Sequence, residues 1–344
     1  MTAQAPGAAR VVDNLNAALH GLFAEDPALF LLGEDVLDPY GGAFKVTAGL
    51  STKYPDRVLS TPISENAIVG VANGLALAGD RVIAEIMFGD FGTLCFDQIV
   101  NVSAKTVSMF GRTVPMPVVV RMPTGGNRGY GPTHSQSLQK HFIGVPDLVL
   151  RELSPLHDNA LVLRQALDSG RPTVFFENKP LYGHRMLTPG PVDDVFGYDF
   201  ADDARTWARV DSDLGGGDCL LIVAGGLFPR ALEAARTLLM EDETAVTVVV
   251  ASQLYPFLPG PVLEDVAAAR HVLVVEEGTP GGTWGSEVAH RLTETCWERL
   301  RHPVGQICSA DSVIPAARHL ERRVVVQAED IVARVRERMA ACTS

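Results

Sequence analysis

The chain has few of the residues that mark secreted, zinc-binding or membrane proteins. Its 344 residues include five cysteines, none in a Cys-x-x-Cys pair and none grouped with histidine at zinc-ligand spacing. We therefore predict no metal site within the chain, and reduced thiols in a cytoplasmic protein. No apolar run approaches the roughly 20 residues that span a bilayer. The segment Met1 to Arg10 also lacks the basic and apolar regions of a secretory signal.

Positive charge is also scarce. The 29 Lys and Arg residues are outnumbered by 41 Asp and Glu residues, which gives a formal net charge of −12. A nucleic-acid-binding surface needs clustered Lys and Arg, so this function class is not favoured. Apolar side chains make up 47% of the sequence, and a chain of this length can bury two domain cores.

Strand-like and helix-like segments alternate along the first half of the chain. Short apolar runs that are typical of buried strands alternate with stretches in which apolar residues recur at helical spacing. This alternation predicts an α/β fold with parallel sheets covered by helices. The expected strands are 29–33, 81–85, 118–121 and 173–177, and the expected helices are 11–26, 66–78, 97–109 and 161–167.

The composition changes after Tyr182. Residues 183–217 are rich in Pro, Gly and Asp and end in Gly215-Gly-Gly217, which is typical of a linker. A second α/β set follows, with expected strands at 219–224, 245–251 and 272–275 and expected helices at 229–240 and 285–300. We therefore predict a first domain at 1–182, a linker at 183–217 and a second domain at 218–344.

The first candidate site residue is Glu65, in Thr61-Pro-Ile-Ser-Glu65. It lies where an apolar strand gives way to a small-residue helix. Such a glutamate can be a functional acid at the carboxyl edge of a sheet. It can equally be a helix N-terminal acid that the helix dipole favours. Spacing alone favours the second interpretation.

The second candidate is His134, in Gly131-Pro-Thr-His-Ser-Gln136, after a glycine-rich loop that starts at Gly125. Open α/β sheets bind ligands in such loops beyond their strands. A surface turn that happens to contain a histidine is an equally good interpretation.

A third set of glycines follows strands in the second half, in Val223-Ala-Gly-Gly-Leu-Phe228 and around Glu276-Glu277-Gly278. A dinucleotide site needs the full Gly-x-Gly-x-x-Gly spacing, which is missing. We therefore reject that interpretation and expect these glycines to form tight turns.

Six segments occur in an order that matches one known family. They are Leu32-Gly-Glu-Asp-Val36, Tyr40-Gly-Gly-Ala-Phe44, Thr61-Pro-Ile-Ser-Glu65, Ala84-Glu-Ile-Met-Phe88, Phe96-Asp-Gln-Ile-Val-Asn101 and Thr133-His-Ser-Gln-Ser137. Together they resemble the β subunit of the decarboxylating component of pyruvate, branched-chain 2-oxo acid and acetoin dehydrogenases. The resemblance runs from about residue 11 to the C-terminus. The second half resembles the transketolase C-terminal domain through Leu254-Tyr-Pro, Val274-Val-Glu-Glu-Gly278 and Ile314-Pro-Ala.

The resemblance implies a transketolase-like pyrimidine-binding domain, a transketolase C-terminal domain and a thiamine diphosphate cofactor. In the family, an α subunit holds the diphosphate through magnesium, and the β subunit holds the aminopyrimidine ring. Glu65 corresponds to the carboxylate that shares a proton with a ring nitrogen and so favours the imino tautomer, an internal base. Ile63, Met87 and Phe91 correspond to residues that flank the ring. Without the resemblance, Met87 and Phe91 would be taken for core residues.

His134 matches the active-site histidine of the family. The resemblance implies that it orients the substrate carboxylate or passes protons during acyl transfer. The implied reaction is oxidoreductase chemistry, in which a 2-oxo acid loses carbon dioxide and its acyl fragment passes to a lipoyl group or another acceptor.

The sequence departs from the family near this histidine. Gly144 stands where members often have a second histidine, His141 stands where an aromatic is usual, and the segment Gly89 to Cys95 is poorer in aromatics. These changes leave the 2-oxo acid and the acyl acceptor open, and they suit a specialised pathway.

The resemblance implies an α2β2 assembly, active only with the α subunit and served by a lipoyl acyltransferase. One alternative is a split transketolase-like subunit that transfers a ketol or acyl unit without a lipoyl partner. Another is a non-catalytic scaffold subunit, against which the retained Glu65 argues.

Overall fold

The structure is a computed structural model that describes residues 8–212 and 217–341. The chain divides into two compact units. The N-terminal unit contains residues 9–125 and 136–186, and the described residues of the C-terminal unit are 8, 126–135, 187–212 and 217–341. The domain limits 1–182, 183–217 and 218–344 stay predictions.

The N-terminal unit is built on a parallel sheet. Its strands follow the order β5-β6-β4-β3-β1-β2, and every pairing between them is parallel. The strands are β1 (Leu29–Gly33), β2 (Val58–Ser60), β3 (Arg81–Glu85), β4 (Val118–Thr124), β5 (Val149–Glu152) and β6 (Thr173–Asn178). All carboxyl ends of these strands meet at one edge, where ligands bind in open α/β sheets.

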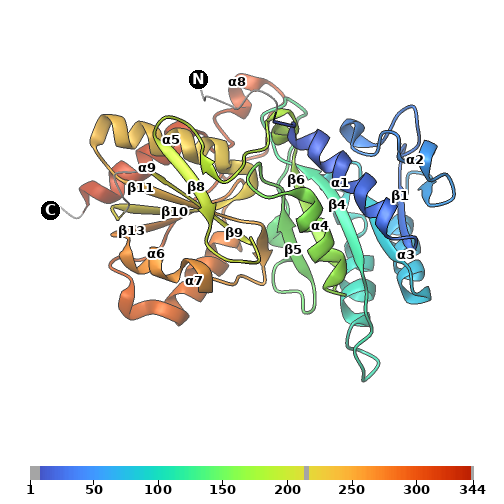
Figure 1. The fold of residues 1–344 in the computed structure, drawn as a ribbon. Helices are drawn as coiled ribbons and strands as arrows, with labels where there is room; N and C mark the ends of the chain where they lie inside the picture. The colour runs from blue at the N-terminus through green and yellow to red at the C-terminus, as the bar shows by residue number, and fades with distance from the viewer. Residues whose placement is uncertain (1–7, 213–216, 342–344) are drawn as a thin grey trace. The chain divides into compact units, whose positions relative to one another are not determined.

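Helices cover this sheet. They are α1 (Val11–Glu25), α2 (Leu50–Lys53), α3 (Glu65–Ala78) and α4 (Asn159–Asp168), with a π-helical segment η3 (Gln98–Ala104). Helices α1 and α4 lie side by side and share one apolar core with β1 (Figure 1). Apolar side chains of α1 at helical spacing, such as Leu15, Leu19 and Leu22, are buried in that core.

The C-terminal unit has a mixed sheet in the order β14-β13-β10-β11-β9-β8-β7. The first four strands pair in parallel and the rest antiparallel. Helices α5 and α9 cover one face, and α6 and α7 the other (Figure 1). The bounds are β7 (Gly190–Pro191), β8 (Phe196–Phe200), β9 (Trp207–Ser212), β10 (Cys219–Ala224), β11 (Val246–Ala251), β12 (Gln253–Tyr255), β13 (His271–Val275), β14 (Gly305–Ile307), α5 (Phe228–Asp242), α6 (Leu263–Ala268), α7 (Trp284–Cys296), α8 (Arg318–Glu321) and α9 (Ala328–Ala340).

The predicted two-domain α/β fold is confirmed, with the addition of three antiparallel strands in the second sheet. These strands, β7 to β9, lie in the segment 183–217 that composition marked as a linker. Gly215 and Gly216 of the predicted glycine tract lie outside the described residues. No helix in the described ranges is long and apolar enough to cross a membrane.

A buried ionic network joins three neighbouring strands of the N-terminal sheet. Arg121 on β4 donates to both carboxylate oxygens of Glu177 on β6, at 2.6 and 2.8 Å, and to Glu85 Oε2 on β3, at 2.8 Å. Tyr182 also donates its hydroxyl to Glu177, at 2.5 Å. All four side chains are buried. Each carboxylate therefore depends on a specific donor, because water does not reach it.

We expect Arg121→Met to lower the free energy of unfolding by about 3–5 kcal/mol, because it leaves Glu85 and Glu177 buried without their cation. Urea unfolding followed by circular dichroism measures this. The matched control is Arg164→Met, which removes an exposed ion pair with Glu25 and should cost less than about 1 kcal/mol. Equal losses in the two variants would contradict the role of the network.

Candidate functional site

Two acidic side chains meet at the carboxyl edge of the N-terminal sheet. Glu65 is the first residue of α3 and is 6% exposed, and Glu34 follows the end of β1 and is 7% exposed. Burial raises the pKa of the Glu34 carboxyl, and the negative charge of Glu65 raises it further. Among the described residues, Glu34 Oε1 has no hydrogen-bond partner. The pair therefore offers a buried carboxyl oxygen that can hold a proton or accept one from a ligand.

The position of Glu65 follows from the local sequence. The Thr61 N–H donates to the Gly33 carbonyl at 3.0 Å, which brings the segment before α3 to the end of β1. Glu65 then lies in the first turn of α3, where the helix dipole stabilises a negative charge. Glu65 is thus a buried acid in the first turn of a helix. This position is compatible with both interpretations made from the sequence, and the functional one stays a prediction.

The loop of the Tyr40-to-Phe44 motif is fixed beside this edge by Glu85. Glu85 Oε1 accepts a hydrogen bond from the Ala43 N–H at 2.8 Å, while its other oxygen binds Arg121. Gly42 has φ +70°, and a Cβ there would lie 2.6 Å from Thr47 Oγ1 and 2.9 Å from Glu85 Oε1. Only glycine fits this close approach. The packing of the loop therefore explains why the motif has a glycine at position 42.

Aromatic rings connect the same loop to the segment after β3. The Phe44 ring lies 6.5 Å from that of Phe88, and the Phe88 ring lies 6.4 Å from that of Phe91, both edge to face. Such pairs add packing energy and fix ring orientation. Phe91 is therefore held in place, yet it is only half-buried.

The other predicted ring-flanking residues lie in the same unit. Met87 follows β3 and is half-buried, and Ile63 precedes α3 and is 83% exposed. Cys95, which the sequence did not single out, is fully buried near Glu65. Burial raises the pKa of its thiol to about 12, and the charge of Glu65 also raises it. The structure thus collects Ile63, Glu65, Met87 and Phe91 in the N-terminal unit, where their role towards a ligand stays a prediction.

His134 belongs to the C-terminal unit, within the loop 126–135. It is half-buried, and its Nδ1 lies 3.0 Å from the hydroxyl oxygen of Thr133. The structure therefore assigns His134 to a different compact unit from Glu65, and its predicted role on the substrate side is not tested by the geometry.

The departures from the family pattern have a partial structural basis. Gly144 has φ +84°, a left-handed backbone that side chains rarely adopt, although a Cβ there would meet no atom within 4 Å. His141 is exposed in the short helical segment η4 (Gln139–Phe142). Neither residue is part of the Glu34–Glu65 pair.

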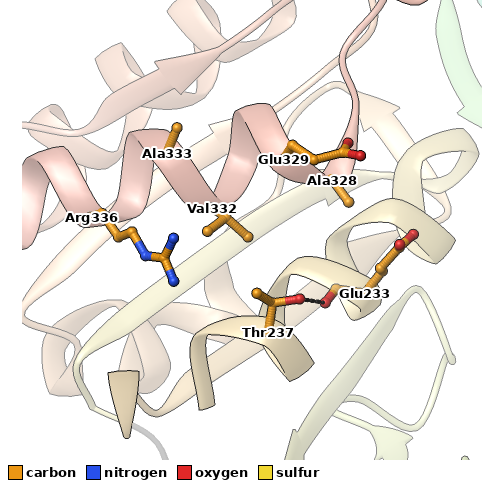
Figure 2. Close-up of a pocket in the computed structure, with 7 residues that line it drawn as sticks. All are labelled: Glu233, Thr237, Ala328, Glu329, Val332, Ala333 and Arg336. Atoms are coloured by element: carbon orange, nitrogen blue, oxygen red, sulfur yellow. Dashed lines mark hydrogen bonds between the residues drawn. The ribbon is translucent and has the colours of Figure 1, made fainter. Parts of the chain in front are cut away.

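A depression on the surface of the C-terminal unit lies between α5 and α9 (Figure 2). It is lined by residues such as Thr237, Val332 and Arg336. The guanidinium of Arg336 already binds Glu241 and Asp242. None of the predicted site residues lines this depression, so we assign no function to it.

Comparison with known proteins identifies the family. Residues 9–185 match the family model described as transketolase, pyrimidine binding domain, and residues 208–331 match transketolase, C-terminal domain. The chain is 33% identical to acetoin:2,6-dichlorophenolindophenol oxidoreductase subunit beta of Cupriavidus necator, over 94% of this chain and 96% of that protein. The chain belongs to the transketolase-like family of 2-oxo acid dehydrogenase β subunits.

Other relatives and a solved structure agree with this family. The chain is 33% identical to 2-oxoisovalerate dehydrogenase subunit beta of Bacillus subtilis, over 95% of this chain and 97% of that protein. It is also 33% identical to pyruvate dehydrogenase E1 component subunit beta-1, mitochondrial, of Oryza sativa, over 94% and 84% of the two chains. A structure titled "Split gene transketolase, inactive beta4 tetramer" covers 96% of this chain and 98% of its own, with a TM-score of 0.70 and 21% identity. This last likeness concerns the fold alone.

We expect Glu34→Gln to change the pH dependence of stability. Since the pKa of Glu34 is raised in the folded state, the unfolded chain ionises first as the pH rises above the ordinary glutamate pKa of about 4.3. The wild type therefore loses stability, relative to the variant, from that pH until the folded carboxyl has also ionised. Unfolding free energies over this range measure the difference. If the difference in unfolding free energy between Glu34→Gln and the wild type stays constant with pH, the pKa of Glu34 is not raised in the folded state.

Proposed function

We propose that the chain is the β subunit of a thiamine-diphosphate-dependent 2-oxo acid dehydrogenase component that is active only with a separate α subunit. The observation that carries the proposal is the buried Glu65 carboxylate at the start of α3, beside a second acid at the carboxyl edge of a parallel sheet. Relatives that span almost the whole chain bear the names of such subunits.

The residues on this edge fit an aminopyrimidine ring. When bound, thiamine diphosphate would supply a nucleophilic thiazolium carbon that can add to a 2-oxo acid, and a cationic ring that can accept the electron pair released with carbon dioxide. Glu65 would hold a proton against a ring nitrogen, and Ile63, Met87 and Phe91 would flank the ring. The large exposed fraction of Ile63 and the partnerless oxygen of Glu34 support a site that a ring can cover.

The two carboxyls suit the holding of one proton. Burial and the charge of Glu65 raise the pKa of Glu34, so Glu34 takes up a proton more readily than an isolated glutamate does. Glu34 thus offers a second place for a proton at the edge where Glu65 would face the ring nitrogen.

His134 is proposed to act on the substrate side. A half-buried imidazole in a loop can hold or pass a proton near neutral pH, and it can donate to a carboxylate. We assign it to orienting the 2-oxo acid carboxylate or to moving a proton during acyl transfer.

The partners follow from the family. We propose an α subunit that holds the diphosphate through magnesium, a second copy of this chain in an α2β2 assembly, and a lipoyl acyltransferase as acceptor. A cytoplasmic location is part of the proposal, and it agrees with the buried thiols of Cys95, Cys219 and Cys296, which form no disulfide. Co-purification with candidate α subunits, followed by a decarboxylation assay over a panel of 2-oxo acids, tests the whole proposal.

A second candidate function is a split transketolase-like subunit that transfers a ketol or acyl unit without a lipoyl partner. Gly144 and His141 support this second function, because they depart from the family pattern near His134, on the proposed substrate side. The same assay, run with and without a lipoyl acceptor and read out as acyl transfer, separates the two, since only the first function needs that acceptor. A scaffold subunit would show no turnover with any α partner.

We expect the purified chain alone to bind thiamine diphosphate weakly and to show no decarboxylase activity. Most of the affinity for a diphosphate comes from charged metal contacts, which we assign to the α subunit. Calorimetric titration with cofactor and magnesium measures this, with the co-purified α–β assembly as control. Micromolar binding by the chain alone would show that it holds a complete site.

We expect His134→Ala in the α–β assembly to lower turnover by about 10²–10⁴-fold, the usual contribution of one acid–base group. Hydrogen–deuterium exchange at the thiazolium carbon should stay near the wild-type rate, because Glu65 is intact. Loss of that exchange would place His134 on the cofactor side instead.

A further inference from the structure

The glycine-rich loop that carries His134 leaves one compact unit and joins the other. Strand β4 ends at Thr124, and the Gly125 N–H donates to the Gln136 carbonyl at 3.2 Å, which closes the neck of the loop. Asp90 Oδ1 also accepts hydrogen bonds from the Gln136 backbone and side chain, at 3.1 and 2.9 Å. The ten residues between them, 126–135, belong to the C-terminal unit.

Two buried carboxylates of the C-terminal unit bind the backbone of this loop. Glu321 at the end of α8 is 1% exposed. Its Oε1 accepts from the Asn127 N–H at 2.8 Å, and its Oε2 accepts from the Gly129 N–H at 2.9 Å. Glu277 Oε1 accepts from the Gly126 N–H at 2.7 Å. Three loop N–H groups are thus held by charged acceptors, whose hydrogen bonds are the strong ones.

The loop sequence suits this arrangement. Gly125, Asn127, Gly129 and Gly131 have φ between +66° and +89°, so left-handed residues occupy alternate positions. Alternation of this kind turns successive N–H groups towards an anion. A Cβ at Gly126 would lie 3.0 Å from Val325 Cγ2 and 3.4 Å from Glu321 Oε1. Glycine therefore allows the backbone to approach the carboxylate.

We propose that Glu321 is a positioning residue for His134. Glu321 accepts hydrogen bonds from two backbone N–H groups of the loop 126–135. These bonds fix the loop and so hold the His134 imidazole in the position where it acts on the substrate. The proposal rests on the proposed role of His134. Glu277 assists from the start of the loop, and its other oxygen binds Arg230 at 2.9 Å.

The need for such a residue follows from the loop itself. Glycine has more conformational freedom than any other residue, so a loop with several glycines costs the most entropy to order. If only a fraction of molecules holds the loop in place, the effective activity falls to that fraction of its full value. The carboxylate restores a single conformation through hydrogen bonds that the glycines alone cannot supply.

Two variants test the backbone contacts in the full-length chain. Glu321→Ala removes both acceptors, and Glu321→Gln keeps one oxygen but turns an amide N–H₂ towards the other donor. Amide hydrogen exchange at Asn127 and Gly129 should become about tenfold faster in Glu321→Ala, as expected for a lost hydrogen bond to a charged acceptor. In Glu321→Gln at least one of the two amides should respond.

Two controls keep this measurement specific. The Gly125 amide, which donates to Gln136, should exchange at the wild-type rate in both variants. Glu329→Gln, an exposed glutamate in the first turn of α9, should change neither loop amide. Unchanged exchange at both Asn127 and Gly129 in Glu321→Ala would overturn the proposal.

A double-mutant cycle in the α–β assembly tests the action on His134. Glu321→Gln should lower kcat by about 10–100-fold, the effect of misplacing a catalytic group, and should change KM much less. Combined with His134→Ala, it should add no further loss, because it acts through a residue that is already gone. An equal loss on both backgrounds would overturn the positioning role.

The two parts of the experiment separate this proposal from the proposed function. Amide exchange needs no turnover, so it reports on the loop even if no α partner or substrate is active. If the loop amides respond and His134→Ala leaves turnover unchanged, the function assigned to His134 fails and the positioning role fails with it. Faster exchange of the loop amides, together with non-additive kcat losses in the Glu321 and His134 double-mutant cycle, supports both the function of His134 and the positioning role of Glu321.

Discussion

Burial of the Arg121 guanidinium beneath the carboxyl ends of β3, β4 and β6 is the constraint on which the N-terminal unit depends. This one cation donates hydrogen bonds to both carboxylate oxygens of Glu177 and to one oxygen of Glu85. The second oxygen of Glu85 accepts a hydrogen bond from the Ala43 N–H. The loop fixed in this way positions the Phe44 ring, and through it Phe88 and Phe91. A buried charge that must be paired thus determines the shape of the edge where Glu34 and Glu65 meet.

In the C-terminal unit, buried carboxylates are also paired with hydrogen-bond donors, but these donors are backbone N–H groups. Glu276 accepts from the N–H groups of Trp284 and Gly285 at the start of α7, at 3.1 and 2.7 Å. Glu277 and Glu321 accept from the loop that carries His134. The Glu276-Glu277 pair, which the sequence marked only as part of a motif, therefore holds two separate backbone segments. The glycine-rich loop before His134 presents its N–H groups to the protein's own carboxylates.

The sequence predicted the long central elements well and the marginal ones poorly. Strands 29–33, 81–85 and 219–224 match β1, β3 and β10 because each contains a short apolar run, such as Val82-Ile-Ala84 between Arg81 and Glu85. Strands β8 and β9 were hidden among Pro, Gly and Asp, whose composition suggested a linker. Strand β9 pairs with β11 and β8 pairs with β9, which is a tertiary effect that composition does not reveal. Of the site, Glu65 was found through its motif, whereas the contact of Glu321 with Gly129 spans 192 residues and has no local signal.

We propose that the Glu65 carboxylate activates the cofactor. The rate of hydrogen–deuterium exchange at the thiazolium carbon of thiamine diphosphate bound to the α–β assembly tests this role. Glu65→Gln is compared with the wild type and with Glu25→Gln, which removes an exposed acid on α1. We expect exchange about 10²–10⁴-fold slower in Glu65→Gln, the contribution of one acid–base group, and unchanged in Glu25→Gln. Exchange at the wild-type rate in Glu65→Gln would show that Glu65 does not activate the cofactor.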